Sequence, residues 1–513
     1  MRRKSRPCTA LGLPQPANSI STNNHKTMNT IKRRTFLKTS LYTGATVAMT
    51  AKSWSQVKGA NETLRVGVVG FRGRGNSHIG AYRGMQQREQ GVRVAALCDV
   101  DKKVLDAGVA KLKKLTPDVQ GHQDIRKMLE DKDLDVVSIA TPNHWHALAS
   151  IWAIQAGKDV YVEKPVSHNV WEGRQIVNAA RKHKKIVQTG TQARSSKCIQ
   201  DAVKFVQSGA LGKIKVSRGL CYKRRGSIGD IPDTKEVPSE IDYNLWIGPA
   251  PMKPLTRSRL HYDWHWMWDY GNGDLGNQGI HQMDIARWFL GDMELSPRVW
   301  SVGGRLGYVD DGETANTQVI YHDYKTAPLI FEVRGLGVKK GSGARPTYRG
   351  GSVAVFVECE KGWVAVRNYG SVQVYDNDNK QIKDFRGGGD HFGNFINAVR
   401  SRNPKDLNAE ILEGHLSSAL CHTGNISHRV GKDASVEDIR DMVKKDGHAL
   451  EAVDRMIDHL AVKNEVDLKA TPLTLGPALD MDPKKEVFMK HAAANKLLTR
   501  EYRKPFVVPD LSS

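Results

Sequence analysis

Short apolar segments alternate with longer amphipathic segments over residues 63–190, and this alternation restricts the fold more than any other feature of the sequence. The apolar segments are rich in Val and Ile, which is typical of strands buried on both faces of a sheet. The segments between them are long enough to form helices that lead from one strand to the next. Strands and helices that alternate in this way predict an α/β domain with a doubly wound parallel sheet.

The first predicted strand runs directly into a glycine-rich turn. Residues Thr63–Gly75 read TLRVGVVGFRGRG, and a helix is expected from about Asn76. Such a turn lets the backbone approach a pyrophosphate, whose charge is stabilised by the N–H groups at the start of the helix. If Gly70 is the first and Gly75 the third glycine of a dinucleotide-binding fingerprint, Arg72 takes the middle position. We therefore predict a Rossmann domain in which Gly70, Arg72 and Gly75 contact a dinucleotide.

The second predicted strand, Val92–Cys98, ends at an acidic residue about 24 positions after Gly75. The carboxylate of this residue, Asp99, can accept hydrogen bonds from the adenosine ribose. It would repel a 2′-phosphate, so the sequence favours NAD, with NADP as the open alternative. The competing role for Asp99 is to cap the helix that begins near Lys102.

The third unit is a strand, Leu134–Ala140, followed by the segment TPNHWH. Asn143 and His146 in this segment are predicted to face the cofactor or the substrate, because ligands of parallel sheets bind at the carboxyl ends of the strands. Helix capping is the alternative role for Asn143, and a solvated position in the first helical turn is the alternative for His146.

The fourth unit places Glu163-Lys164-Pro165 directly after the apolar strand Val160–Val162. Both charged side chains should therefore lie at the same edge of the sheet as the glycine-rich turn, where we predict that they contact the cofactor. Pro165 stiffens the turn that directs them. Lys164 is interpreted as an active-site lysine.

These motifs, together with Gly273–Asp284 (GDLGNQGIHQMD), resemble those of the glucose-fructose oxidoreductase, inositol dehydrogenase and MocA (Gfo/Idh/MocA) family over about residues 63–431. In that family the Glu-Lys-Pro lysine helps to position and deprotonate a substrate hydroxyl, a role that carries over to Lys164. The second motif supplies an aspartate and, four residues later, a histidine for proton transfer. Asn277 and His281 stand at these positions, and asparagine cannot take up a proton at neutral pH.

The resemblance implies an NAD(P)-dependent oxidoreductase that acts on a sugar, a polyol or a glycoside. Oxidation of an alcohol needs a base for the hydroxyl proton, and both histidine and a lysine of lowered pKa can supply one. Lys164 and His281 are therefore the acid-base candidates, with Asn277 beside them. Asp284, three residues after His281, could orient its imidazole and contact the substrate.

An aromatic stretch at 260–270 precedes the second motif and includes Trp264 and His265. Aromatic faces bind sugar rings, so both residues are predicted to contact a carbohydrate substrate. A core cluster or a subunit interface is the alternative. His261 and His265 have the spacing of metal ligands, but no glutamate completes a zinc-protease pattern, and no metal is predicted.

Residues 1–60 are predicted to form a leader. Arg33 and Arg34 precede the mildly apolar stretch Thr39–Ala51 and resemble a twin-arginine export signal, which implies a periplasmic or otherwise exported protein, with Met28 as an alternative start. The apolar stretch is too short to span a bilayer, so no stable membrane insertion is expected.

The basic charge of the chain comes largely from this leader. The formal net charge is +22, and removing the 11 Lys and Arg residues of positions 1–60, which contain no acid, leaves +11. No nucleic-acid-binding module is recognisable, and nucleic acid is not expected as a partner. As partners we expect a small carbohydrate and further copies of the same chain.

The remaining sequence divides into three predicted parts. Residues 61–190 form the Rossmann domain, residues 191–431 a substrate and oligomerisation domain, and residues 432–513 a C-terminal extension. From about residue 191 strands follow one another with few helices, which predicts an α+β domain with a largely antiparallel sheet. The long insertion at 224–269 is predicted to be a loop that covers the substrate.

Two other functions share these motifs. An NAD-dependent glycoside hydrolase of the same fold oxidises one carbon transiently, and such glycosidases can replace the Glu-Lys-Pro lysine, so Lys164 favours the dehydrogenase. Arg72 and Asn277 depart from the family pattern, as they would in a non-catalytic sugar-binding or regulatory protein. For an exported enzyme we expect a tightly bound, recycled cofactor, because the space outside the cytoplasmic membrane has no evident nicotinamide pool.

Overall fold

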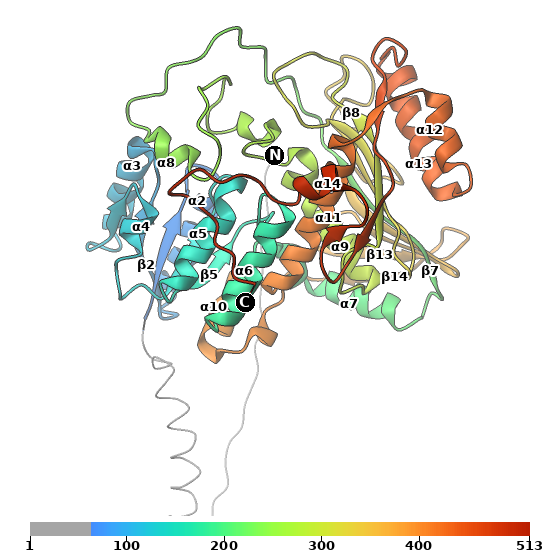
Figure 1. Cartoon of the computed structure of the whole chain (residues 1–513). Helices are drawn as coiled ribbons and strands as arrows, with labels where there is room; N and C mark the ends of the chain where they lie inside the picture. The colour runs from blue at the N-terminus through green and yellow to red at the C-terminus, as the bar shows by residue number, and fades with distance from the viewer. Residues whose placement is uncertain (1–62, 513) are drawn as a thin grey trace, which may run out of the picture. The chain divides into compact units, whose positions relative to one another are not determined.

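A six-stranded parallel sheet forms the first part of the computed structural model, which describes residues 63–512 (Figure 1). The predicted leader and export signal lie outside these residues. The strand order is β3-β2-β1-β4-β5-β6, and every neighbouring pair is parallel. The order reverses between β1 and β4, where such sheets bind dinucleotides. The predicted doubly wound sheet is thereby confirmed. Its strands are β1 (Leu64–Val69), β2 (Val92–Cys98), β3 (Gln120–His122), β4 (Val136–Ile139), β5 (Asp159–Val162) and β6 (Val187–Thr189).

Helices connect these strands and cover both faces of the sheet. Asp101 caps α3, since its side chain accepts hydrogen bonds from the backbone N–H groups of Lys103 and Val104. The capping role considered for Asp99 is thus performed by Asp101, and Asp99 does not cap α3. The helices are α2 (Gly75–Gln87), α3 (Lys102–Lys113), α4 (Ile125–Met128), α5 (Asn143–Gln155) and α6 (Val170–Lys182).

A second sheet of twelve strands follows, in the order β14-β13-β12-β11-β7-β10-β9-β8-β16-β15, with β17 on β8 and β18 on β17. Only the pair β7 and β10 is parallel among the pairs of this sheet, which confirms a largely antiparallel α+β domain. The strands are β7 (Ile214–Tyr222), β8 (Arg298–Gly304), β9 (Thr317–His322), β10 (Leu329–Arg334), β11 (Val353–Cys359), β12 (Gly362–Val366), β13 (Ser371–Tyr375), β14 (Gln381–Arg386), β15 (Lys432–Ala434), β16 (Leu473–Leu475), β17 (Leu479–Asp482) and β18 (Val487–Phe488).

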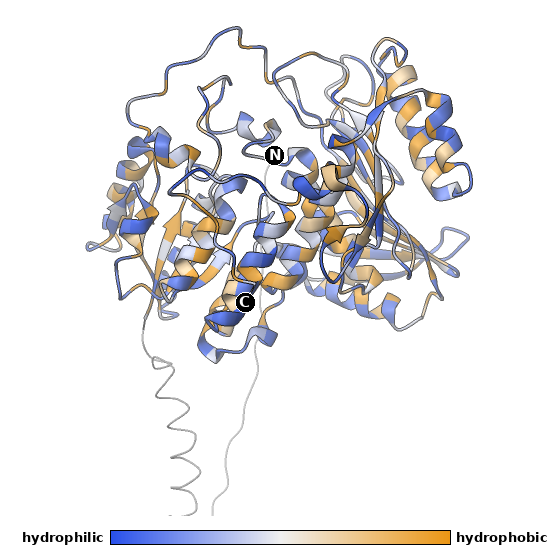
Figure 2. Cartoon of the chain, viewed as in Figure 1, coloured by the Kyte–Doolittle hydropathy of each residue, from blue (hydrophilic) through white to orange (hydrophobic). Residues whose placement is uncertain are grey.

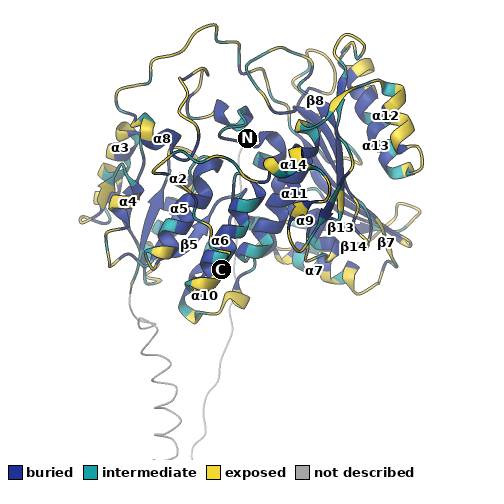
Figure 3. Cartoon of the chain, in the orientation of Figure 1, coloured by how far each residue is buried: buried dark blue, intermediate teal, exposed yellow. Residues whose placement is uncertain are grey.

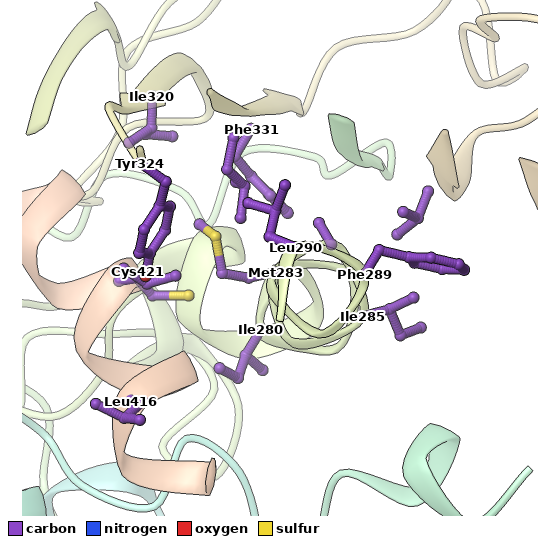
Figure 4. Packing of buried hydrophobic residues seen from close by; sticks show 14 of the residues in the cluster. Ile280, Met283, Ile285, Phe289, Leu290, Ile320, Tyr324, Phe331, Leu416 and Cys421 are labelled. Atoms are coloured by element: carbon purple, nitrogen blue, oxygen red, sulfur yellow. The ribbon is translucent and has the colours of Figure 1, made fainter. Parts of the chain in front are cut away.

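One face of this sheet packs on α9 (Ile280–Leu290) and α11 (Ile411–Arg429). Figure 4 shows side chains of α9, Met283 among them, packed between the strand residue Phe331 and Cys421 of α11. Apolar residues concentrate on the strands and on the helix faces turned to them (Figure 2), and the same positions are buried (Figure 3). This core fixes the start of α9, which carries the second motif. The other helices of this part are α7 (Lys197–Gln207), α8 (Tyr243–Ile247), α10 (His391–Ser401), α12 (Val436–Val443), α13 (Gly447–Ile457) and α14 (Ala492–Lys496).

The segment after residue 431 belongs to the second sheet rather than to a separate extension. Strands β15, β16 and β17 lengthen the sheet beyond β8, and apolar residues of α12 and α13 cover its other face. The chain then returns to the first domain, where Phe506 packs into the core beside Trp145. The predicted boundary at residue 431 therefore does not coincide with a structural boundary, because burial of the sheet face requires the later residues.

The insertion at 224–269 lies against the Rossmann domain. Backbone hydrogen bonds join Lys102 to Glu240 at 2.9 Å and Asp242 to Val100 at 3.1 Å. The insertion therefore meets the carboxyl end of β2, close to the predicted position of the adenosine ribose.

Candidate active site

A cleft of about 370 Å³ opens at the carboxyl ends of β1, β2, β4 and β5. The insertion closes it from the other side. Its lining includes most of the residues predicted from the sequence, namely Gly70, Arg72, Asp99, Asn143, His146, Glu163, Lys164, Trp264, His265 and Asn277. Four strand ends and the insertion thus form a single binding site, as expected for the switch point of a doubly wound sheet.

The glycine-rich turn approaches the next strand closely. Gly70 has a φ of +73°, and a Cβ atom there would lie 2.9 Å from the backbone nitrogen of Thr141. At Gly75 a Cβ atom would lie 2.3 Å from the carbonyl oxygen of Gly70. A side chain is therefore excluded at both predicted glycines. Gly73, which was not among the predicted contacts, lines the cleft, and a Cβ atom there would meet no atom within 4 Å. Its bare backbone faces open space, where a ligand can approach.

Asp99 links the glycine-rich turn to the end of β2. Its carboxylate accepts hydrogen bonds from the backbone nitrogens of Phe71 at 3.0 Å and Asp101 at 3.1 Å. Burial raises the pKa of Asp99 to about 6, although these hydrogen bonds oppose the shift. The side chain is therefore ionised at neutral pH, and it lines the cleft at the place where a ribose acceptor is expected.

Glu163 holds a network behind the cleft. Its carboxylate accepts hydrogen bonds from Arg74 Nε at 2.8 Å and Gln192 Nε2 at 3.2 Å, and it lies 3.1 Å from His78 Nε2. Burial alone would raise the pKa of Glu163, but the hydrogen bond and charge of His78 and the charges of Arg74 and Lys164 hold it well below its usual range. Glu163 therefore remains an anion whose hydrogen bonds go to the protein, and Arg74 ties the glycine-rich turn to the Glu-Lys-Pro motif.

Lys164 reaches the second motif across the cleft. Its Nζ donates a hydrogen bond of 2.6 Å to the backbone carbonyl of Asn277. Burial lowers the pKa of Lys164, Glu163 opposes this shift, and the charges of Arg74 and Lys223 reinforce it. Asn277 lies in a π-helical turn, Leu275–Gly279, a rare conformation that is frequent at functional sites. The predicted neighbours Lys164 and Asn277 are thus brought together.

His281 and Asp284 take positions that the spacing did not predict. His281 does not line the cleft, and burial together with the charge of Lys164 lowers its pKa to about 3. The influence of the Lys164 charge shows that His281 lies near that lysine, so its part in proton transfer stays a prediction. Asp284 is fully buried, where it forms an ion pair of 2.8 Å with Arg194 and accepts a hydrogen bond of 2.7 Å from Ser417. The predicted contact of Asp284 with His281 or substrate is therefore not supported, because the buried carboxylate is stabilised by its ion pair with Arg194.

Asn143 and His146 line the cleft with their polar groups already engaged. Asn143 is the first residue of α5 after the N-cap Pro142, and its Nδ2 donates to Asn272 Oδ1 at 3.0 Å. The ring nitrogens of His146 lie 2.6 Å from the carbonyl oxygen of Pro165 and 2.8 Å from that of Thr141. Burial lowers the pKa of His146, so the neutral ring donates to one of these two carbonyl oxygens and lies between the end of β4 and the turn that carries Lys164.

The aromatic residues of the insertion line the cleft and pack against one another. The rings of Trp264 and His265 stack at 3.7 Å, and Trp264 also belongs to the small apolar core of the insertion. His261 Nε2 lies 3.1 Å from the carboxylate of Asp101. Within residues 63–512 no three His, Cys, Asp or Glu side chains come together as metal ligands. Over the same residues no helix has the length and apolar character needed to cross a membrane.

The cleft fits a dinucleotide on three structural grounds. Gly73 leaves room for close approach, the N-terminus of α2 follows it, and the Asp99 carboxylate stands at the end of the neighbouring strand. These features define a two-domain dinucleotide-binding protein.

The comparison with protein families agrees with this class. Residues 64–191 match the model described as oxidoreductase family, NAD-binding Rossmann fold, and residues 195–464 match the model of the C-terminal alpha/beta domain of the same oxidoreductase family. The chain belongs to the Gfo/Idh/MocA family of oxidoreductases.

Characterised relatives resemble the chain over parts of its length. Inositol 2-dehydrogenase of Salmonella typhimurium is 30% identical over 193 residues, which cover 36% of this chain and 54% of that protein. Alpha-N-acetylgalactosaminidase of Shewanella oneidensis is 35% identical over 129 residues, which cover 24% and 27%. The chain thus spans about half the length, or less, of the curated relatives it matches.

A solved structure shares the fold over a longer stretch. The WlbA dehydrogenase from Bordetella pertussis, in complex with NADH and UDP-GlcNAcA, aligns with a TM-score of 0.51 and 20% identity. The alignment covers 70% of this chain and 94% of that one. At this identity the likeness concerns the fold.

Proposed function

We propose that the protein is an NAD(P)-dependent oxidoreductase that acts on a CH–OH group of a sugar, a polyol or a glycoside. The observation that carries this proposal is the position of Lys164, whose Nζ lies in the same cleft as the glycine-rich turn and Asp99. A basic group and a dinucleotide site in one cleft are what the oxidation of an alcohol needs.

The residues of the chain have distinct tasks in this proposal. The glycine-rich turn and the start of α2 hold the pyrophosphate, and Asp99 accepts hydrogen bonds from the ribose and favours NAD over NADP. When bound, the nicotinamide supplies the hydride chemistry. Lys164, whose pKa is lowered, takes the proton from the substrate hydroxyl at Nζ and returns it in the reverse direction. The carbonyl of Asn277 holds Nζ in place, and the rings of Trp264 and His265 support the sugar.

The test is reduction of NAD, followed by its absorbance in the near ultraviolet, with a panel of inositols, aldoses and methyl glycosides. We expect activity with at least one member of the panel, and Lys164→Ala should abolish it while the protein stays folded. Activity that is equal in the variant would refute the assignment of the lysine.

A glycoside hydrolase that uses the same cofactor is the second candidate. The similarity to the Shewanella enzyme over 129 residues favours it. An aryl α-N-acetylgalactosaminide separates the two functions. A hydrolase releases the aryl group without net formation of NADH, whereas a dehydrogenase forms NADH and leaves the glycosidic bond intact. If neither reaction occurs although sugar binds, the non-catalytic alternative is favoured.

We further propose that the protein is exported by the twin-arginine route with its cofactor already bound. The pair Arg33-Arg34 before a short apolar stretch supports export, and export of a folded protein permits loading in the cytoplasm. The test is extensive dialysis of protein recovered from the periplasm, followed by turnover without added nucleotide. Complete dependence on added NAD would overturn the bound-cofactor proposal, and retention in the cytoplasm would overturn export.

We also propose that the protein forms a homo-oligomer. The proposal extends the expectation, made from the sequence, that residues 191–431 form a substrate and oligomerisation domain. Light scattering of the purified protein measures its mass, and a monomer at micromolar concentration would contradict the proposal.

A further inference from the structure

A second cavity, of about 250 Å³, lies apart from the cleft. It is enclosed by the residues before α6, the end of α11, the end of the insertion and residues 496–501 of the C-terminal segment. None of its lining residues belongs to the proposed catalytic machinery, so the role of this cavity is independent of the proposed function.

One wall of this cavity carries an arginine with no salt bridge. Arg429 stacks on the ring of Trp268 at 4.9 Å, and no carboxylate within the described chain lies at ion-pair distance from its guanidinium. Burial lowers the pKa of Arg429, while the more distant charges of Glu313 and Asp269 oppose the shift. Arg429 is exposed to solvent. Arginine stays charged in proteins, so the rim of the cavity carries a cation that no carboxylate of residues 63–512 neutralises.

A histidine on the same wall has a defined tautomer. Arg500 donates a hydrogen bond of 3.2 Å to His168 Nδ1 and another of 2.8 Å to the carbonyl oxygen of Asp269. Because a guanidinium can only donate, Nδ1 of His168 must be the acceptor and Nε2 must carry the proton. His168 Nε2 is buried and has no hydrogen-bond partner within residues 63–512. A buried N–H group without an acceptor is destabilising, so an acceptor from outside the chain would be bound favourably at this position.

A second buried histidine of the cavity also has a ring nitrogen without a partner. His422 is only 3% exposed and lines the cavity, and its Nδ1 has no partner in the described structure. Its Nε2 lies 3.4 Å from the hydroxyl oxygen of Ser167. Burial lowers the pKa values of His168 and His422, so both rings are neutral at pH 7 and each carries one N–H donor.

The carboxylates of the cavity do not satisfy these donors. Asp269 is paired with Lys253 at 2.6 Å, and it approaches Arg500 only to 3.9 Å. Glu501 is exposed to solvent. The balance of charge therefore favours an anion, since Arg429 and Arg500 face the cavity and the nearest acid is already neutralised.

We propose that this cavity binds an oxyanion, the phosphate or carboxylate group of a small molecule, between Arg429, Arg500 and the Nε2–H of His168. Guanidinium groups and a neutral imidazole N–H match the acceptor oxygens of such a group. Asn272 connects the site to the cleft: its Nδ2 donates to the carbonyl oxygen of His168 at 3.0 Å, and its Oδ1 accepts from Asn143. The oxyanion site is therefore linked through Asn272 to Asn143, which lines the cleft.

The test is calorimetric titration of the full-length protein with inorganic phosphate and, separately, with glucuronate, at constant ionic strength and with NADH present to fill the glycine-rich turn. We expect binding of at least one anion, and the two titrations distinguish phosphate from carboxylate. Arg429→Gln should weaken it at least about tenfold, because a charge-assisted hydrogen bond is lost. Arg349→Gln is the control, since Arg349 is also an exposed arginine stacked on a tryptophan, Trp363 at 4.8 Å, but it pairs with Glu358 and does not line the cavity. This variant should bind the anion as the unaltered protein does.

Two results would overturn the proposal. One is the absence of binding for both anions. The other is equal binding by Arg429→Gln and Arg349→Gln, which would assign the anion to another place on the surface. If Arg429→Gln does not fold, crystals of the unaltered protein soaked in tungstate decide the question: an anomalous peak beside His168 Nε2 supports the site, and its absence there refutes it.

Discussion

Replacement of Asn277 by aspartate is predicted to raise the pKa of Lys164 and to move the pH dependence of turnover upward. Lys164 Nζ lies 2.6 Å from the backbone carbonyl of Asn277, so a carboxylate on that residue would stand close to the ammonium group. Two unit charges about 5 Å apart attract by about 3 kcal/mol at an effective dielectric constant of about 20, which equals about 2 pK units. Partial exposure of Asn277 reduces the expected shift to about 1 unit.

The assay is kcat/KM for alcohol oxidation as a function of pH, with NAD saturating. Its acid limb reports the loss of the proton from the base. Asn277→Asp should move this limb upward by about 1 unit, since more of Lys164 is protonated at any given pH. Glu163→Gln should move it downward, because the Glu163 charge opposes the lowering of the pKa of Lys164. Asn277→Leu removes the amide without adding charge and serves as the control. An acid limb that stays in place in Asn277→Asp, or moves equally in Asn277→Leu, would refute Lys164 as the titrating base.

Three further predictions concern the cleft. Lys164→Ala should lower kcat at least about a hundredfold, as measured by initial rates, because positioned proton-transfer groups contribute that much; a change below about threefold would contradict it. The affinity for NADH should fall as the pH decreases from 7 to 5, because Asp99, with a pKa of about 6, loses its charge, and titrations of Asp99→Asn should show no such dependence. Gly75→Ala should destabilise the protein by about 1–3 kcal/mol in thermal unfolding, because its Cβ would lie 2.3 Å from a backbone oxygen. Gly73→Ala should unfold normally and bind NADH less tightly; equal unfolding of the two variants would contradict the geometry.

The first domain and the edge of its sheet can be predicted from the sequence because they depend on local signals. Apolar segments define the strands, and each strand end delivers its next residues to one edge, so strand order along the chain is enough to place Gly70, Asp99 and Lys164 in a common site. The largely antiparallel second sheet follows from strands that succeed one another with few helices between them.

Contacts between distant segments could not be predicted in the same way. Asp284 is paired with Arg194, and Arg74 with Glu163. The two residues of each pair are far apart in the sequence, so the spacing within a motif does not indicate the contact. The order of strands in the second sheet, and hence the place of β15 to β18 in it, depends on contacts between segments that are far apart in the sequence.

NAD is proposed to bind in this cleft with its adenosine ribose at Asp99. The most direct measurement is a pair of equilibrium titrations, with NADH and with NADPH, of the unaltered protein and of Asp99→Ser. The unaltered protein should prefer NADH. In the variant the ratio of NADPH to NADH affinity should rise at least about tenfold, because the repelling carboxylate is gone and the exposed Arg72, which lines the same cleft, would attract a 2′-phosphate. Failure of both nucleotides to bind, or an unchanged ratio in Asp99→Ser, would contradict the account.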